Sequence, residues 1–144
     1  MKKIVVVLLM GMFIMSCSNS DDYNNNNPYL LDPLVSLNLN LNLPEYNALK
    51  FPGSSIFITQ QGIKGIVIYN VNNEIYTASE LSDPNHTPSD CSSMSISGII
   101  ATCPCPDDDH EYDIVTGKHR TDETLYPIQQ YRIERNGDNI FVSN

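Results

Sequence analysis

Basic residues are scarce in this sequence. Its 144 residues include 8 Lys and Arg against 17 Asp and Glu, which gives a formal net charge of -9 at pH 7. Binding to nucleic acid requires Lys and Arg to neutralise phosphates, and binding to an anionic lipid surface draws on the same charges. The composition therefore argues against both kinds of partner, and we interpret the acidic surface as one that keeps the protein soluble.

The sequence also lacks the motifs that mark common catalytic sites. Ser, His and Asp are all present, but no nucleophile elbow orders them, and no glycine-rich loop is placed to cradle a phosphate. No convincing amphipathic helix and no internal repeat is found. We therefore expect a protein that is not an enzyme and whose domain is built from strands.

The main apolar run lies at the N-terminus and is too short to span a bilayer. Lys2 and Lys3 give a positive start, an apolar run follows from Ile4 to Phe13, and Ser16-Cys17 ends the segment. This is a signal-peptide pattern, and its end resembles the bacterial lipobox, in which the cysteine is lipidated and becomes the new N-terminus. We therefore expect residues 1–16 to be removed and Cys17 to carry a lipid. An ordinary secretory peptide with an incidental cysteine is the alternative.

A polar segment follows the predicted anchor. Residues 18–27 are mostly Ser, Asp and Asn, and such a stretch cannot bury enough apolar surface to fold. We expect residues 17–32 to form a disordered tether. The acidic Ser/Asp run resembles the surface-export signal of Bacteroidetes lipoproteins, which implies attachment to the outer membrane, at its periplasmic face or at the cell surface.

Residues 33–144 are predicted to form one all-β domain. From Val35 to Leu43 apolar and polar residues alternate strictly, which places the apolar set on one face of a strand. Asn136-Gly137 is the preferred pair for a tight type I′ turn and predicts a hairpin. The class is a small sandwich or a partly open barrel. Further strands are expected where β-branched and apolar residues lie between turn signals: 55–59, 66–69, 75–78, 95–102, 111–115, 128–135 and 139–142.

Three cysteines lie in the predicted domain: Cys91, Cys103 and Cys105. The secretory leader places them in an oxidising compartment, where a disulfide is the default expectation. Because three is an odd number, one thiol stays free or serves as a ligand.

The residues around these cysteines resemble a Rieske-type iron–sulfur domain. Cys103-Pro104-Cys105, followed by residues 111–117, is similar to the second cluster-binding loop of that family, and residues 83–91 stand where the family has its first loop. The flanking strands agree, so the resemblance covers residues 49–144. It implies a Rieske-like all-β fold with two cysteine-bearing loops.

The ligand positions depart from the family pattern. A Rieske cluster takes two Cys on one iron and two His on the other. Cys103 matches the ligand cysteine of the second loop, but Pro106 stands where that loop has its ligand histidine. The ligand cysteine of the first loop falls near Asp83, and only His86 stands near a ligand histidine position. His110 could turn inward from the longer second loop.

An acidic run replaces the Gly-Ser that hydrogen-bonds the cluster sulfurs in the family. Asp107, Asp108 and Asp109 would add negative charge beside an anionic cluster, which is unfavourable. A calcium loop would need alternating oxygen ligands and a glycine, and the run has neither. We expect a solvated acidic loop.

The resemblance also implies a disulfide between Cys91 and Cys105, with Cys103 left as the free thiol. Pairing of Cys91 with Cys103 stays open. We expect no cofactor, with a [2Fe–2S] cluster as the alternative. A zinc site is a further alternative, made by the three cysteines with His86 or His110.

Two functions follow from this interpretation. The first is a membrane-anchored lipoprotein that has lost the cluster and acts as a binding or structural module. The second is an electron-transfer protein that holds a [2Fe–2S] cluster through unusual ligands. The leader has Lys2-Lys3 and no Arg-Arg pair, so it does not resemble twin-arginine export of a folded, loaded protein. This favours the first function. The sequence identifies neither a protein partner for the first function nor a redox partner for the second.

Overall fold

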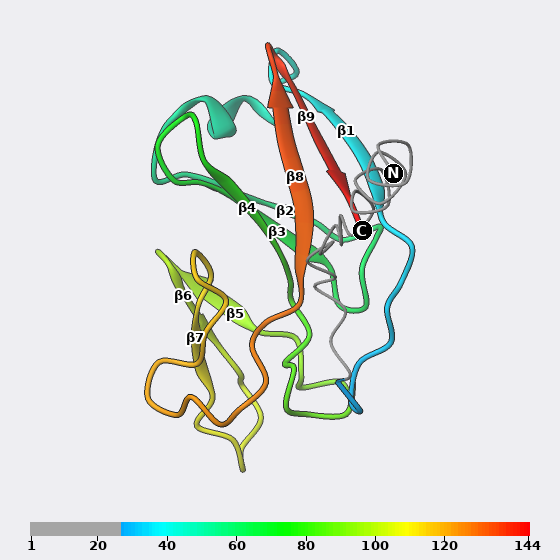
Figure 1. Cartoon of the computed structure of the whole chain (residues 1–144), viewed down its shortest axis with the longest axis vertical. Helices are drawn as coiled ribbons and strands as arrows, with labels where there is room; N and C mark the ends of the chain where they lie inside the picture. The colour runs from blue at the N-terminus through cyan, green and yellow to red at the C-terminus, as the bar shows by residue number, and fades with distance from the viewer. Residues whose placement is uncertain (1–26) are drawn as a thin grey trace, which may run out of the picture.

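The computed structural model describes residues 27–144, so the predicted signal peptide and Cys17 lie outside the described residues. No helix in the described range is long and apolar enough to cross a membrane. The elements follow one another along the chain as labelled in Figure 1: β1 (Ser36–Asn40), the 3-10 helix η1 (Asn47–Lys50), β2 (Ser55–Ile58), β3 (Ile66–Asn70), β4 (Tyr76–Glu80), β5 (Ser95–Ser97), β6 (Ile100–Thr102), β7 (Glu111–Asp113), β8 (Gln130–Asn136) and β9 (Asn139–Ser143).

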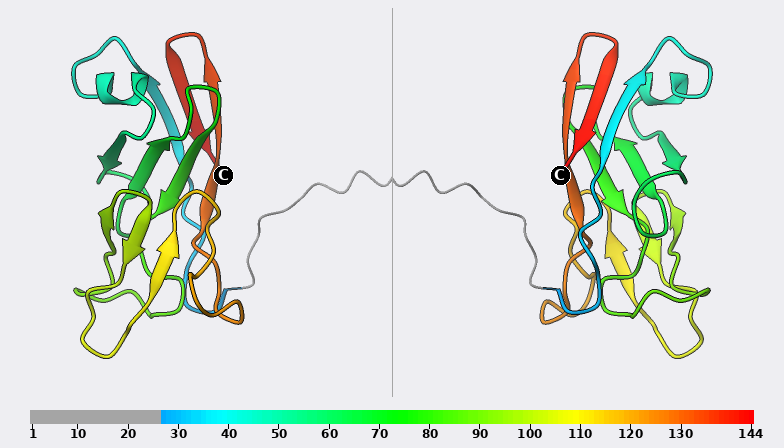
Figure 2. Two further views of the ribbon diagram at one scale, coloured as in Figure 1. Left: turned by 90° about the vertical axis from the view of Figure 1, so that its left-hand side faces the viewer. Right: turned by 90° about the vertical axis from the view of Figure 1, so that its right-hand side faces the viewer.

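The strands form two antiparallel sheets. The larger sheet has the order β1-β9-β8-β4-β3-β2, and the smaller sheet has the order β5-β6-β7. Strand β8 joins the halves of the larger sheet, since Gln130 and Tyr131 pair with β4 while residues 132–136 pair with β9. The larger sheet curls around its own core, and the smaller sheet lies beyond one end of it (Figures 1 and 2). The predicted all-β class is confirmed.

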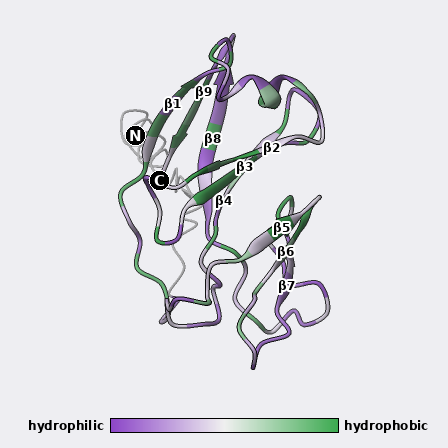
Figure 3. Ribbon diagram, turned by 180° about the vertical axis from the view of Figure 1, so that it is seen from behind, coloured by the Kyte–Doolittle hydropathy of each residue, from purple (hydrophilic) through white to green (hydrophobic). Residues whose placement is uncertain are grey.

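Strand β3 separates two hydrophobic cores because successive side chains of a strand point to opposite faces. Ile66 and Ile68 face the core inside the curled sheet, with Leu39, Leu41 and others. Val67 faces the second core, which lies against the smaller sheet. Figure 3 shows the apolar colouring of β3. The loops that carry the cysteines are therefore anchored on apolar packing shared by both sheets.

The alternation predicted from Val35 to Leu43 is confirmed for most of its length. Val35, Leu39 and Leu41 are buried at 2% exposure or less, whereas Leu43 is exposed. Strand β1 ends at Asn40, so Leu43 lies beyond the paired region.

Two turns differ from the sequence prediction. The hairpin of β8 and β9 pairs Asn136 with Asn139, so Gly137 and Asp138 are its two central residues. Only Gly137 of these has a positive φ, +59°, which is typical of a type II′ turn rather than the predicted type I′. The single stretch predicted over 95–102 is two short strands, β5 and β6, because Gly98 has a φ of +62° and turns the chain between them.

A buried carboxylate fixes the end of β4 next to the first cysteine loop. Glu80 is fully buried and accepts hydrogen bonds from the backbone N–H groups of Ile63, Lys64 and Ser82 at 2.8 to 3.0 Å. It also accepts one from the Tyr131 hydroxyl at 2.7 Å. Gly62 is required beside it, since a Cβ at this position would lie 2.6 Å from Glu80 Oε2. These bonds hold β4 and β8 in register where the loop begins.

The last residues assigned to the tether lie against the domain. Asn27 donates to the backbone carbonyl of Pro84 at 2.7 Å, and the ring of Tyr29 packs edge-on against Tyr126. Asp32 accepts a hydrogen bond from Gln129 at 2.9 Å. The tether prediction is thus corrected for residues 27–32, because polar side chains there bond to the folded chain. Residues 17–26 lie outside the described range.

Candidate functional site

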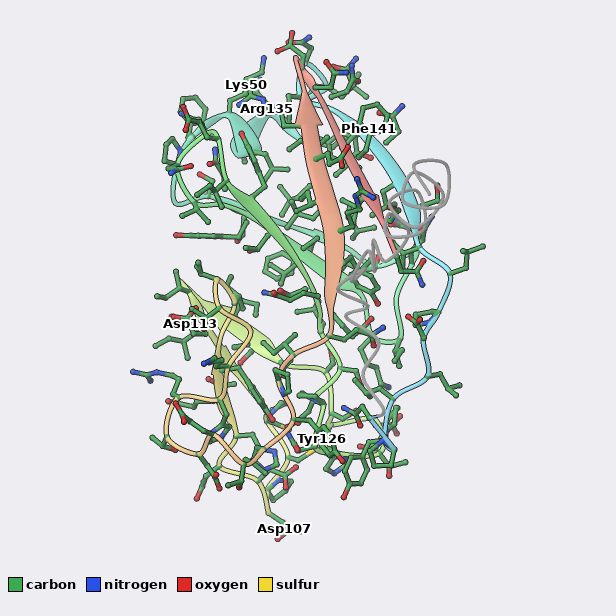
Figure 4. All side chains as sticks on the ribbon, in the orientation of Figure 1. Lys50, Asp107, Asp113, Tyr126, Arg135 and Phe141 are labelled. Atoms are coloured by element: carbon green, nitrogen blue, oxygen red, sulfur yellow. A yellow bond between two sulfur atoms is a disulfide. The ribbon has the colours of Figure 1, made fainter. Side chains whose placement is uncertain are left out.

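Two loops meet at the end of the smaller sheet. The first loop, residues 81–94, connects β4 to β5, and the second loop, residues 103–110, connects β6 to β7. Figure 4 places Asp107 of the second loop at the tip of the molecule. Each loop is closed by backbone bonds, from Asp83 N–H to Ser92 in the first and from Cys103 N–H to His110 in the second. The bases of both loops are therefore fixed.

A disulfide joins the two loops. Cys91 of the first loop is bonded to Cys105 of the second, with a Cα–Cα distance of 5.1 Å. Cys103 is free and buried. Of the two pairings left open by the sequence, the one implied by the Rieske resemblance is confirmed.

Asp83 is the centre of a buried polar network between the loops. Its carboxylate is fully buried, and Oδ1 accepts hydrogen bonds of 2.8 Å from the Tyr112 hydroxyl and from the Asn85 N–H. Oδ2 lies 2.8 Å from Nδ1 of His110. Burial alone would raise the pKa of Asp83, but these hydrogen bonds more than offset it, so the pKa lies below its usual value. Because an ionised carboxylate only accepts, Nδ1 of His110 carries the proton.

The thiol of Cys103 faces two carboxylates. Its Sγ lies 3.7 Å from Oδ2 of Asp108 and also interacts with Asp83. Burial raises the pKa of Cys103 to about 12, and the negative charges of both carboxylates act in the same direction. The thiol therefore stays protonated in the metal-free protein, and it is a poor nucleophile.

The acidic run is only partly solvated. Asp107 and Asp109 are exposed, as predicted, but Asp108 turns inward and is half-buried. Its Oδ2 lies 3.6 Å from Nε2 of His86. The prediction of a uniformly solvated loop is corrected at Asp108, because the histidine and the Cys103 thiol give its carboxylate polar neighbours inside the loop.

The two candidate histidines occupy different places in this arrangement. His110 turns inward, as the sequence allowed, and is held by Asp83. His86 is partly exposed, and its Nδ1 bonds the backbone carbonyl of Thr87 at 2.6 Å. A third histidine, His119, packs edge-on against the rings of His110 and Tyr112. These ring contacts of His119 were not predicted, because only the tertiary fold brings His119 beside β7.

Potential metal donors gather in three overlapping groups, each with its ligand atoms within 4.8 Å of one another. The first combines His86, Cys91 and Cys105, but its two sulfurs are joined in the disulfide. The other two groups share Asp108 and contain the free thiol and the buried carboxylate. All three groups are: His86, Cys91 and Cys105; Cys103, Cys105 and Asp108; Asp83, Asp108 and His110.

The side chains present do not match the donors of a Rieske cluster. That cluster needs two thiolates and two imidazoles, whereas the disulfide leaves one free thiol among the described residues. Asp83, which stands near the first-loop ligand cysteine, is committed to Tyr112, Asn85 and His110. The chemistry of the loops is that of a disulfide, a buried acid–histidine pair and one thiol.

No protein-family model matches the chain, and no curated protein matches it. Among solved structures, it is similar to a ferredoxin of Sphingomonas yanoikuyae, with 18% identity over 65% of this chain and 88% of that one, at a TM-score of 0.44. It is also similar to the ferredoxin of carbazole 1,9a-dioxygenase from Nocardioides aromaticivorans. The identity is 14% over 65% of this chain and 86% of that one, and the TM-score is 0.45.

A nitrite reductase small subunit from Erwinia carotovora has 18% identity over 67% of this chain and 77% of that one, with a TM-score of 0.38. The chain's own topology, with its curled six-stranded sheet and a three-stranded sheet carrying two cysteine loops, agrees with the Rieske-like architecture predicted from the sequence.

Proposed function

We propose that this chain is a non-enzymatic, extracytoplasmic module that keeps a Rieske-like fold, has lost the iron–sulfur cluster, and works by binding a partner or as a structural element. The observation that carries the proposal is the Cys91–Cys105 disulfide, which joins the two loops and leaves one free thiol among the described residues. The residue at position 83 supports it further, because an Asp stands near the position of the first-loop ligand cysteine.

The state of the free thiol supports a non-enzymatic role. A catalytic cysteine needs an accessible thiol with a lowered pKa. Cys103 is 4% exposed, and its pKa is raised to about 12. Nucleophilic chemistry at this cysteine is therefore disfavoured.

We further propose that a lipid on Cys17 holds the domain at the outer membrane, on its periplasmic face or at the cell surface. The signal-peptide pattern and the lipobox-like Ser16-Cys17 support this proposal. The net charge of -9 is consistent with a lipid anchor rather than electrostatic attachment to the membrane.

Electron paramagnetic resonance tests the proposed loss of the cluster. The full-length protein is purified from its native membranes, reduced with dithionite and measured alongside a Rieske ferredoxin as the positive control. We expect no signal from a reduced [2Fe–2S] cluster. A signal that scales with protein concentration would instead support an electron-transfer protein with unusual ligands.

A further inference from the structure

Three donor side chains gather on the inner side of the two loops, and a fourth, Cys103, lies beside one of them. The ligand atoms of Asp83, Asp108 and His110 lie within 4.8 Å of one another. The Sγ of Cys103 lies 3.7 Å from Asp108 Oδ2, so Asp108 belongs to both groups of donors. Asp83 and Cys103 are buried, and the other two are partly buried.

We propose that Asp83, Cys103, Asp108 and His110 form a site for a single divalent transition-metal ion, for which Zn²⁺ is the best match. One thiolate, one imidazole and carboxylates are a donor set that suits this borderline ion, and four ligands complete its tetrahedral shell. The site goes beyond the proposed function and requires only that the disulfide is intact. It differs from an iron–sulfur centre in needing one sulfur rather than two.

The distances are close to those that zinc requires. With Zn–S of about 2.3 Å and Zn–N or Zn–O of about 2.0 Å, tetrahedral ligand atoms lie about 3.3 to 3.6 Å apart. The 3.7 Å between Cys103 Sγ and Asp108 Oδ2 is close to this range. The 2.8 Å hydrogen bond between Asp83 and His110 would open slightly as both atoms turn to the ion. Asp83, Asp108 and His110 can thus reach one ion by side-chain rotation, and Cys103 would turn toward it from its place beside Asp108.

The charge balance of the loops favours a cation here. Two carboxylates and a thiol face two imidazoles. Within residues 27–144 the ion-pair partners of Asp83 and Asp108 are His110 and His86 rather than Lys or Arg. Buried carboxylates are costly unless they are paired or coordinate a metal. Binding of Zn²⁺ releases the proton of the Cys103 thiol to solvent, and the proton on Nδ1 of His110 moves to Nε2 so that the neutral imidazole can ligate. No oxidation state changes.

Neighbouring groups are placed to orient the ligands. The Tyr112 hydroxyl and the Asn85 N–H hold the Asp83 carboxylate, each at 2.8 Å. Nε2 of His86 lies 3.6 Å from Oδ2 of Asp108, the oxygen that also faces Cys103 Sγ. Such supporting hydrogen bonds to ligands are typical of metal sites. The alternative group of His86, Cys91 and Cys105 would require a reductant, because its sulfurs are bonded to each other.

Metal titration of the oxidised full-length chain tests the site. A Cys17→Ser background removes the only cysteine outside the loops, and mass spectrometry confirms that the disulfide is intact. Zn²⁺ binding is measured by calorimetry, and Co²⁺ binding by visible spectroscopy. We expect one ion per chain and a thiolate-to-cobalt absorption band, which Cys103 alone can supply in this background.

Variants assign the ligands. We expect Cys103→Ser to abolish the cobalt band, and both Cys103→Ser and His110→Gln to weaken Zn²⁺ binding at least about tenfold. Asp107→Asn, which changes an exposed neighbour in the same loop, is the matched control and should leave binding unchanged. Circular dichroism checks the fold of each variant, and the cobalt band of the unaltered loops decides the question if a variant misfolds.

Three outcomes would overturn the proposal. These are an absence of Zn²⁺ binding while the disulfide is intact, equal binding by Cys103→Ser, and binding that appears only after reduction, which would assign the ion to Cys91 and Cys105. Failure of the proposed function is distinguishable, since an iron–sulfur signal from the native protein would be seen independently of the Zn²⁺ titration.

Discussion

The environment of the Cys103 thiol is unlike that of a reactive cysteine. Its side chain is 4% exposed, and burial together with nearby carboxylates raises its pKa to about 12. In a Cys17→Ser chain kept free of reductant and metal, a thiol reagent should label no cysteine in the folded protein and one per chain in denaturant. Rapid labelling of the folded protein, or more than one thiol in denaturant, would contradict this arrangement.

Ionisation of the Tyr131 hydroxyl makes the stability of the fold depend on pH at high pH. Burial raises its pKa above the ordinary value of 10.0, and the neighbouring Glu80 charge acts in the same direction. The unfolded chain therefore ionises this tyrosine first. The stability it contributes is complete below about pH 10 and is lost as the pH rises toward the folded-state pKa, by up to about 1.4 kcal/mol per pH unit.

A comparison of Tyr131→Phe with the unaltered chain tests this dependence. Urea unfolding at about pH 8 and about pH 11 should show a smaller loss of stability in the variant, because the ionising group is absent. At neutral pH the variant should be less stable by about 1–3 kcal/mol, since Glu80 loses a hydrogen-bond donor in a buried site. An equal alkaline loss in both chains would show that Tyr131 does not carry the effect.

At the level of elements, the disulfide determines how firmly the two loops are held together. Cys91 and Cys105 are 14 residues apart in sequence, and the chain-entropy model gives about 3 kcal/mol for a loop of this size. The Cys91→Ser, Cys105→Ser double variant should lose about that free energy of unfolding, with Cys103 left unchanged. Limited proteolysis should cut it first within residues 81–94 or 103–110.

The positions of the cleavage sites show whether the disulfide stabilises the two loops alone or the whole domain. If the double variant lost no stability and gained no cleavage sites in either loop, the disulfide would not be what holds the loops together. The hairpin of β8 and β9, which packs in the other core, is the internal reference and should keep its resistance to cleavage.

The strands could be predicted largely from the sequence, because their signals are local. The alternation from Val35 to Leu43 predicted the buried face of β1, and a glycine marked the hairpin of β8 and β9. Errors arose where a glycine conformation decided the turn: Gly98 splits one expected strand, and Gly137 takes the first central position. Such choices depend on backbone φ, which residue patterns constrain only loosely.

The site was less predictable than the strands. The cysteine pairing followed from resemblance to a family, but the bond between Asp83 and His110 joins residues 27 positions apart. The inward turn of Asp108 and the support from Asn85 and Tyr112 likewise depend on how the loops pack. The buried tyrosine after the acidic run was a possible signal, since a buried hydroxyl needs a polar partner.

At the scale of the whole molecule, the loop end of the domain lies next to the point where the chain leads back to the predicted anchor. Asn27 bonds to Pro84 of the first loop. Cys17 and Asn27 are ten positions apart in the sequence, a length that spans at most about 35 Å. A lipid on Cys17 would therefore keep the two loops within that distance of the membrane surface.

Replacement of the anchor cysteine tests this arrangement. Cys17→Ser should move the protein from the membrane fraction to the soluble envelope fraction, because the negative charge offers no second means of attachment. Ser18→Ala is the matched control and should stay membrane-bound. Retention of Cys17→Ser in washed membranes would contradict lipid anchoring at this residue.

The two loops hold a disulfide and an acid–histidine pair where a Rieske domain has its cluster ligands. The most direct test measures non-haem iron and free thiols per chain in one sample of the protein purified from its native membranes. We predict no stoichiometric iron and a domain with Cys91 bonded to Cys105 and only Cys103 free. About two irons per chain, with Cys91 and Cys105 reduced, would contradict the account and support an electron carrier.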